Sequence, residues 1–371
     1  MKSQADILED DLVALGVLDT LLKDHTTRRN ILWATDSYAN LGDAYKASCE
    51  IKSEDITGDD EVGQDDQKIR KGQIVQPRSK KSAEVQSQRV KDKAEVFTPS
   101  WICNAQNNLI DSRWFGRKDR PIFNVENDDH SWTPVEGHID FEGSGHTWEE
   151  YVKDLRLEIT CGEAPYIVSR YDTVTGDIID LDKRVGLLDR KMRVIKENVG
   201  KDLKKWVKMT KEALKSIYGY EWQGDSLLLA RESIFVSILD YYEELFGSRK
   251  PHYQTRKSFA RIISWNLWQM DGLKMVVPDS CHPELIEPPK IEPGLFDEID
   301  KPQAPPEPQY RECPGCKAGD RTKHNGIQCR IRDWSIKKKP KGWDPNCEQA
   351  KLSDDAPWQI ITFSSLLQSE K

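Results

Sequence analysis

Four of the eight cysteines lie near the end of the chain, where they could bind a metal ion. Cys313 and Cys316 are separated only by Pro-Gly, and Cys329 and Cys347 follow Cys316 by 13 and 31 residues. A tetrahedral Zn²⁺ site takes four such ligands, and His324 is a spare candidate. We therefore predict zinc at Cys313, Cys316, Cys329 and Cys347. Unligated thiols are the main alternative, and redox use ranks lower because no thioredoxin-like βαβ unit surrounds the pair.

A second group of residues could bind a nucleotide-like ligand. Cys161, Gly162 and Glu163 directly follow one expected strand, Glu221 ends another, and Asp271 lies just beyond a third. In a doubly wound sheet, ligands bind beyond the carboxyl ends of the strands. A glycine there lets the backbone approach the ligand, and a carboxylate accepts the ribose hydroxyls. These residues predict a crevice in which Asp271 contacts an adenine amino group, although an ordinary sheet with polar loops would share the pattern.

Three short apolar runs are expected to be the strands that position these residues: Leu155–Thr160, Ile217–Glu221 and Ile262–Asn266. Between them, residues 189–216 and 226–246 have apolar residues at helical spacing. Alternation of strands and helices is typical of a doubly wound parallel sheet. The predicted fold class is therefore α/β, a Rossmann-like sheet with insertions, plus a small C-terminal Cys-rich region.

Two further helices are expected from capping residues and apolar spacing. Thr98 and Pro99 have the residue types of an N-cap and a first helical position. The buried face of that helix is predicted to hold Trp101, Ile102, Ala105, Leu109 and Ile110. Residues 1–24 carry leucines and an isoleucine every three or four positions, which predicts one helix whose apolar stripe packs on a partner surface.

Shifts in composition divide the chain into five parts. Residues 1–49 form an N-terminal helical segment, and 50–93 form a polar, charged and flexible arm. Residues 94–277 hold the expected ligand-binding sheet. Residues 278–308 are a Pro-rich acidic linker, which cannot form a regular element. Residues 309–371 are Cys-rich and basic, and their final apolar strand is expected to complete the sheet.

In chain order, four segments resemble the cofactor-binding half of adenine-specific DNA methyltransferases from restriction-modification systems. The segments are Ala94–Asp111, Leu157–Tyr166, Tyr218–Arg231 and Ile262–Leu273. They resemble, respectively, the family's Phe-Thr-Pro motif, its Asp-Pro-x-Cys-Gly-x-Gly-x-Phe loop, its Gly-x-Glu strand, and a strand with Asn followed by Asp-x-Leu. With Val168–Asn198, which looks like a linking segment of some restriction methylases, the resemblance covers residues 94–275.

The resemblance implies S-adenosylmethionine as cofactor and methyl transfer to adenine in DNA as reaction. The residues it implies around the cofactor are Phe97, Thr98, Pro99, Cys161, Gly162, Glu163, Glu221 and Asp271. Two departures occur in the second segment. Glu158 and Ile159 replace the family's Asp-Pro, and Ala164 and Pro165 stand where the second glycine would be, which restricts the loop.

The family's catalytic tetrapeptide, Asp/Asn-Pro-Pro-Tyr/Phe, does not occur after Asp271. Asp355, Pro357 and Trp358 supply an acceptor, a proline and a ring in the same order, and are the candidate catalytic residues. A polar turn before a terminal strand is the preferred interpretation of that string. We therefore consider an active methyltransferase, alone or with another restriction-modification subunit, a catalytically degenerate DNA-binding, specificity or regulatory subunit, and other chemistry on a nucleotide.

Composition limits the surroundings in which the chain works. It has 371 residues, a net charge of −8, 37% hydrophobic and 32% charged residues. No stretch approaches the apolar length of a membrane helix, and eight cysteines are too dilute for a disulfide scaffold. We expect a cytoplasmic protein with no membrane partner. Basic residues at 321–341, interleaved with Trp334 and Trp343, suit DNA or equally a partner protein.

Overall fold

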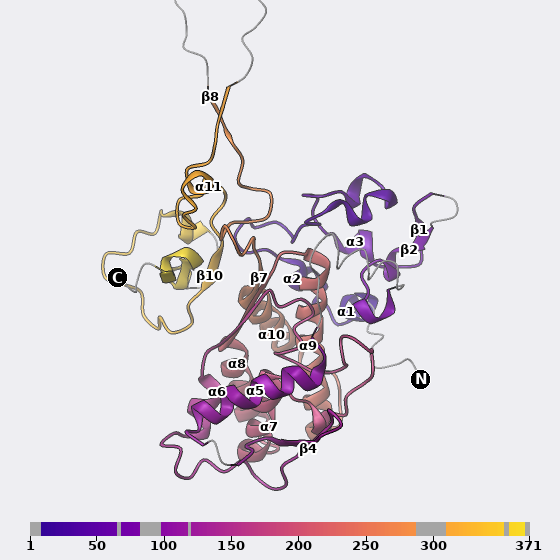
Figure 1. Ribbon diagram of the computed structural model, residues 1–371, viewed down its shortest axis with the longest axis vertical. Coiled ribbons are helices and arrows are strands. Elements are labelled where there is room, and N and C mark those ends of the chain that lie inside the picture. The colour runs from indigo at the N-terminus through magenta and orange to yellow at the C-terminus, as the bar shows by residue number, and fades with distance from the viewer. Residues whose placement is uncertain are drawn as a thin grey trace, which may run out of the picture.

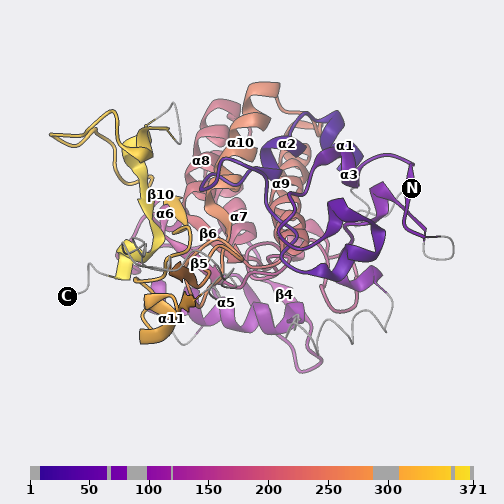
Figure 2. The same cartoon turned by 90° about the horizontal axis from the view of Figure 1, so that it is seen from above.

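The computed structural model (Figure 1) contains a three-stranded parallel sheet, of which Figure 1 labels β7 and Figure 2 labels the other two strands. Its strands are β5 (Arg156–Ile159), β6 (Ile217–Glu221) and β7 (Leu267–Gln269), in that order. The mixed α/β class is thereby confirmed. The structure describes residues 9–64, 68–81, 98–117, 120–286, 309–351 and 356–367.

Along the chain, two helices separate each strand of the sheet from the next. α7 (Leu187–Val199) and α8 (Leu203–Lys215) connect β5 to β6, and α9 (Gly224–Phe246) and α10 (Tyr253–Asn266) connect β6 to β7. Figure 2 shows these helices grouped on one side of β5 and β6. The Asp202 side chain accepts the Lys205 N–H at the start of α8. Gly247 ends α9 in the left-handed conformation, at φ +70°.

The N-terminal apolar stripe packs inside this molecule. The expected single helix is two short ones, α1 (Glu9–Ala14) and α2 (Leu18–Leu22), separated by Gly16 at φ +71°. The buried leucines of this segment join the main core, and α2 contacts α9 and α10. The expected partner surface is thus corrected, because the helices of the same chain cover the stripe.

The third predicted strand was placed one element too early. Ile262–Asn266 form the last part of α10, and the strand begins at Leu267. The run is apolar because this end of α10 is buried, and a short buried run suits a strand and a buried helix equally well. The Asn266 side chain donates to the Leu214 and Ile217 carbonyls, each at 2.9 Å, and so fixes the helix end beside β6.

Helix α5 (Ser100–Trp114) buries a different face from the predicted one. Trp101 and Leu109 are 37% and 63% exposed, so the predicted buried face is wrong. The N-cap position falls on Pro99 instead of Thr98. The residues that α5 buries are mostly polar: Ser100, Cys103, Asn104, Asn107 and Asp111.

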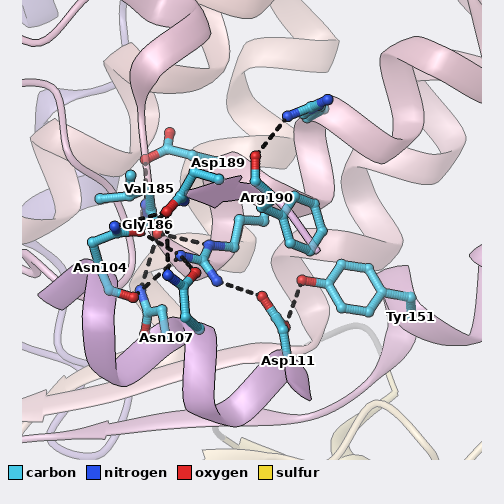
Figure 3. A network of polar contacts seen from close by, with 12 residues as sticks. Asn104, Asn107, Asp111, Tyr151, Val185, Gly186, Asp189 and Arg190 are labelled. Atoms are coloured by element: carbon cyan, nitrogen blue, oxygen red, sulfur yellow. Dashed lines mark hydrogen bonds and ion pairs between the residues drawn. The ribbon is translucent and has the colours of Figure 1, made fainter. Parts of the chain in front are cut away.

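A buried arginine on α7 explains this inversion (Figure 3). Arg190 pairs with Asp111 at 2.5 Å and donates to the Asn104 Oδ1 atom at 2.8 Å. The Tyr151 hydroxyl also donates to Asp111, at 2.9 Å. Unpairing a buried ion pair costs about 3–5 kcal/mol. The polar face of α5 therefore turns inward, where Asp111 and Asn104 pair with Arg190.

The C-terminal region forms its own small ladders. β8 (Glu284–Ile286) pairs with β9 (Gln309–Arg311), and β10 (Arg330–Arg332) pairs with β11 (Ile360–Thr362), both antiparallel. The expectation that the final strand completes the parallel sheet is therefore wrong. A second core lies between the two regions, and it contains Tyr220, Trp268, Met270, Met275, Val277, Cys329 and Ile331.

Parts of the expected flexible arm are regular structure. They hold α3 (Ser53–Ile56) and a hairpin of β1 (Glu61–Val62) with β2 (Ile69–Arg70). Ile56 and Ile74 are buried there, which corrects the prediction for residues 50–64 and 68–81.

The remaining short strands and α-helices are β3 (Asn124–Glu126), β4 (Trp132–Pro134), α6 (Trp148–Lys153) and α11 (Pro314–Ala318).

Candidate metal centre and ligand crevice

Three thiols and one imidazole converge in the C-terminal region. His324 Nδ1 lies 3.6 Å from the Sγ atoms of Cys281, Cys313 and Cys316. Cys281 Sγ lies 3.8 Å from Cys316 Sγ. All four ligand atoms lie within 4.8 Å of one another, so the Cys₃His cluster could hold a metal ion.

Local sequence places these ligands. Cys313 is the N-cap of α11, and Pro314 takes the first helical position, where a missing N–H costs nothing. Gly315 is required because a Cβ there would lie 2.5 Å from the His324 backbone nitrogen. Cys281 lies within the Pro-rich segment, shortly before β8, and the strand β8 corrects the prediction that residues 278–308 form no regular element.

Hydrogen bonds prepare one of the thiols as a ligand. Burial opposes ionisation of Cys313, but the backbone amides of Cys316 and Asn325 lower its pKa to about 6. The Asn325 N–H lies 3.3 Å from Cys313 Sγ. By contrast, burial and the neighbouring thiols raise the pKa of Cys281 to about 11. Such N–H···S bonds to a ligand atom are typical of metal sites.

The predicted ligand set is therefore corrected at two positions. Cys313 and Cys316 belong to the cluster, whereas Cys329 is buried in the second core and donates to the Gln269 carbonyl at 3.4 Å. Cys347 lies in a separate turn, where its N–H donates to the Asp344 carbonyl. Cys281 was missed because more than thirty residues, most of them in the Pro-rich segment, separate it from Cys316. All eight cysteines are described, and all are free of disulfide bonds.

The residues that were predicted to line a ligand crevice gather at the carboxyl ends of the parallel strands. The Gly162 N–H, after β5, donates to Glu221 Oε2 at 2.9 Å across the end of β6. Glu221 Oε1 accepts the N–H groups of Trp222 and Gln223 at 2.9 and 3.1 Å. Burial raises the pKa of Glu221, while the Gln223, Gly162 and Trp222 amides oppose that shift. Cys161 is buried behind this loop, against Gly219 of β6.

The loop after β5 is strained. Thr160, Gly162 and Ala164 have φ angles of +50°, +52° and +62°. A left-handed conformation costs a non-glycine residue roughly 1–2 kcal/mol. Ala164 thus adopts the backbone conformation that the missing second glycine would adopt freely. Strain of this kind is frequently kept at ligand sites.

Glu158 is a second carboxyl group in this region, and one of its oxygens lacks a partner. Glu158 is 9% exposed, and its Oε1 accepts the Tyr166 N–H at 3.4 Å. Its Oε2 is buried without a hydrogen-bond partner among the described residues. Burial raises the pKa of Glu158 well above its ordinary value; the Tyr166 amide opposes the shift and the charge of Glu221 adds to it. In the sequence, Glu158 is noticeable only because it replaces the Asp of the family's loop motif.

Other predicted cofactor residues hold the loop in place. Glu163 is buried and accepts the Tyr171 hydroxyl and the Arg78 N–H, each at 2.7 Å. The Thr98 carbonyl accepts the Thr173 hydroxyl at 3.2 Å, so the start of α5 lies beside the turn that follows this loop in the sequence. Pro99 is the N-cap of that helix, and Phe97 lies outside the described residues.

The N-terminal segment and a turn complete the edge of the crevice. The Gln269 side chain bonds to both the N–H and the carbonyl of Leu32, at 2.7 and 2.8 Å. Gly224 is needed here because a Cβ would lie 2.1 Å from the Leu32 oxygen. Asp271 Oδ1 accepts the N–H groups of Leu273 and Lys274 at 3.0 and 3.1 Å, so it caps the turn after β7.

Backbone hydrogen bonds connect the metal centre to this edge. The Val277 N–H donates to the Ile327 carbonyl at 2.8 Å, and the Cys329 N–H donates to the Met275 carbonyl at 3.1 Å. These bonds join the segment that leads from β7 to Cys281 with the segment that follows His324. The two candidate sites are therefore parts of one continuous structure.

The candidate catalytic string is not brought to the crevice. Pro357 and Trp358 form a 3₁₀ turn before β11, and Asp355 lies outside the described residues. Gln359, at the end of this turn, accepts the Asp333 N–H at 2.7 Å and donates to the Ile336 carbonyl. Among the described residues, no hydrogen bond or ion pair joins Pro357 or Trp358 to a crevice residue.

Comparison of the chain with protein-family models, curated proteins and solved structures finds no match. Within the part of the chain that the structure describes, no helix combines the length and apolar character needed to cross a membrane. Inference about function therefore depends on the residues of the two sites.

Proposed function

We propose that the chain is an S-adenosylmethionine-dependent DNA adenine methyltransferase-like protein of a restriction-modification or phage-defence system. One observation carries the proposal: the Gly162 N–H, in the loop after β5, lies 2.9 Å from Oε2 of Glu221, the last residue of the neighbouring parallel strand β6. A glycine loop beside a strand-end carboxylate is the arrangement that binds nucleosides in doubly wound sheets. The Rossmann-like methyltransferase fold is part of the same proposal, and so are DNA as partner and the cytoplasm as compartment.

The polar groups of the crevice suit this cofactor chemically. S-adenosylmethionine carries a sulfonium and an ammonium group together with two ribose hydroxyls. Glu221 would accept the ribose hydroxyls, and the unpartnered Glu158 Oε2 would accept a donor of the methionine end. The cofactor, when bound, supplies the methyl group. Gly162 lets the backbone come close, and Asp271 stiffens the turn that borders the adenine side.

A degenerate, non-enzymatic subunit is the second candidate function. The sequence lacks the Asp/Asn-Pro-Pro-Tyr/Phe string, and Pro357 and Trp358 belong to the antiparallel C-terminal region. Both observations favour a chain that holds cofactor or DNA while another restriction-modification subunit supplies the acceptor loop.

We also propose that the metal at the Cys₃His cluster is zinc. Zn–S and Zn–N bonds of about 2.3 and 2.05 Å at tetrahedral angles give S···S and S···N separations of roughly 3.8 and 3.6 Å. In the cluster, the Cys281–Cys316 S···S separation is 3.8 Å, the three S···N separations are 3.6 Å, and all four atoms lie within 4.8 Å of one another. Four protein ligands leave no open position, which is the arrangement of a structural site.

Calorimetric titration with S-adenosylmethionine tests the cofactor proposal. Wild type and Glu243→Ala, an exposed carboxylate on α9, are expected to bind. Glu221→Ala is expected to lose at least about tenfold in affinity, since a charged hydrogen bond contributes about 1.5–3 kcal/mol. Absence of binding by wild type would overturn the proposal.

Transfer of labelled methyl groups to DNA separates the two candidate functions. The assay is run with the chain alone and with subunits encoded beside it added. Turnover by the isolated chain excludes the degenerate subunit, and loss of that turnover in Asp355→Ala would assign the catalytic string. Turnover only with an added subunit supports the second candidate.

Metal analysis of the purified chain tests zinc. One zinc per chain is expected for wild type and for Cys347→Ser, whereas Cys316→Ser should lose it. Cys347→Ser is the matched control because Cys347 belongs to the sequence-based set and lies outside the cluster. Equal zinc content in both variants would contradict the assigned ligands.

A further inference from the structure

An open cavity of about 520 Å³ lies between α2 and the first half of α10. Its lining includes Lys23, Lys257 and Arg261, together with Ser258 and a single carboxylate, Asp19. Among the described residues of this lining, lysine and arginine side chains outnumber carboxylates by three to one. The chain as a whole has a net charge of −8, so this local excess is opposite in sign to the molecule.

The basic residues extend along α10 beyond the cavity. The helix contains Arg256, Lys257 and Arg261 and no acidic residue. Among the described residues, neither Lys23 nor Lys257 has a carboxylate within ion-pair distance. Lys257 Nζ lies 5.0 Å from the centre of the Tyr253 ring, and that ring is 42% exposed. Lysines without a carboxylate partner are the residues that neutralise the phosphates of a nucleic acid.

His25 at the back of the cavity is a fixed neutral donor or acceptor. Its ring stacks on Trp265 at 4.0 Å, and its Nε2 lies 2.9 Å from the Ser264 hydroxyl oxygen. Burial lowers the pKa of His25 well below its ordinary value, and the charges of Arg231, Arg261 and Lys23 lower it further. The cavity is therefore positive at neutral pH through its lysines and arginine alone.

We propose that this cavity binds a backbone phosphate of duplex DNA, with α10 lying along the neighbouring phosphates. Lysine and arginine side chains neutralise phosphates, and hydroxyls such as that of Ser258 donate to their oxygens. The open mouth suits a phosphate that remains part of a polymer. The inference rests on the DNA partner of the proposed function and adds the surface that contacts it.

Fluorescence anisotropy of a labelled duplex, measured over a range of salt concentrations, tests this surface. The cavity variant is Lys23→Gln/Lys257→Gln. The matched control is Lys204→Gln/Lys208→Gln, which removes the same charge from exposed positions on α8. The cavity variant is expected to lose roughly tenfold in affinity, and its log–log salt slope should fall by about 2, one unit for each phosphate contact. The control should change by less than about threefold.

Several results would overturn the inference. Equal losses in the two variants would show diffuse attraction, and an unchanged cavity variant would remove the site. Wild type that binds inorganic phosphate or an acidic peptide and no duplex would assign the cavity to another anion. Thermal unfolding of each variant checks that it is folded. Titration of the same variants with S-adenosylmethionine separates this test from the cofactor proposal, because each binding event is measured without the other ligand.

Discussion

The metal centre and the ligand crevice differ in what their polar groups do within the chain. At the crevice, Glu221 accepts three backbone N–H groups, and Glu163 is bonded on both oxygens. These carboxylates therefore stabilise the fold whether or not a ligand binds. At the metal centre, three thiols and His324 converge on one point. Contacts between thiols add little to the stability of a fold unless the thiols bind a metal ion. The evidence for a bound ligand is therefore stronger at the metal centre than at the crevice.

Metal removal should produce the largest effect and tests the comparison directly. Structural zinc contributes about 10–16 kcal/mol to the folding of small zinc domains. We expect chelation, or Cys316→Ser, to expose the amides of residues 276–281 and 309–332 to hydrogen exchange while α7 to α10 stay protected. Unchanged exchange in Cys316→Ser would mean that the cluster has no metal-dependent role.

Substitution of Glu221 should have the next largest effect. Glu221→Ala leaves the partly buried N–H groups of Gly162, Trp222 and Gln223 without their acceptor. Each such loss costs about 1–3 kcal/mol, so chemical denaturation should show a fall of at least that size. Glu221→Gln, which keeps an acceptor, should lose less. Equal stability of Glu221→Ala and wild type would remove the structural role that distinguishes the crevice from the metal centre.

The pH dependence of stability should report on Glu158. The folded-state pKa of Glu158 is raised above 4.5, mainly by burial, so the folded state holds a proton that the unfolded state releases. Its stabilising contribution is complete below pH 4.5 and is lost as pH rises through the folded-state pKa, by about 1.4 kcal/mol for each unit between the two values. Denaturant titrations from pH 4 to 8 should show a weaker decline for Glu158→Gln than for wild type.

The smallest expected effect concerns the strained loop. Gly162→Ala adds a side chain at φ +52° and should cost roughly 1–2 kcal/mol of unfolding free energy. Gly137→Ala, at φ +80° on open surface, is the control for the conformational term alone. If the two variants lose equal stability but only Gly162→Ala loses cofactor affinity, the loop acts in binding beyond its structural role.

Sequence reasoning succeeded where a local pattern determines the structure. The bounds of β6 are as predicted. A predicted helix precedes its apolar run, and the carboxylate of Glu221 ends it. The meeting of Gly162 with Glu221 followed from strand ends and parallel topology alone. These features depend on spacing along the chain, which is visible in one sequence.

The failures share a different cause, which is pairing between distant segments. Cys281 joins Cys313 across the Pro-rich segment, and no spacing rule connects them. Pairing of β11 with β10 depends on the second core, which takes residues from both sides of that segment. The face of α5 is decided by Arg190, nearly eighty residues from Asp111. Nothing in the local pattern of α5 reveals that arginine.

The inverted packing of α5 also sets a register. Apolar surfaces tolerate small slides and rotations, whereas a hydrogen-bonded ion pair does not. A rotation of α5 by one residue would separate Asp111 from Arg190 and leave a buried charge alone (Figure 3). The ion pair therefore fixes the rotation of α5 about its axis. Because Thr98 and Pro99 directly precede its first turn, the ion pair also fixes where these two residues lie beside Thr173.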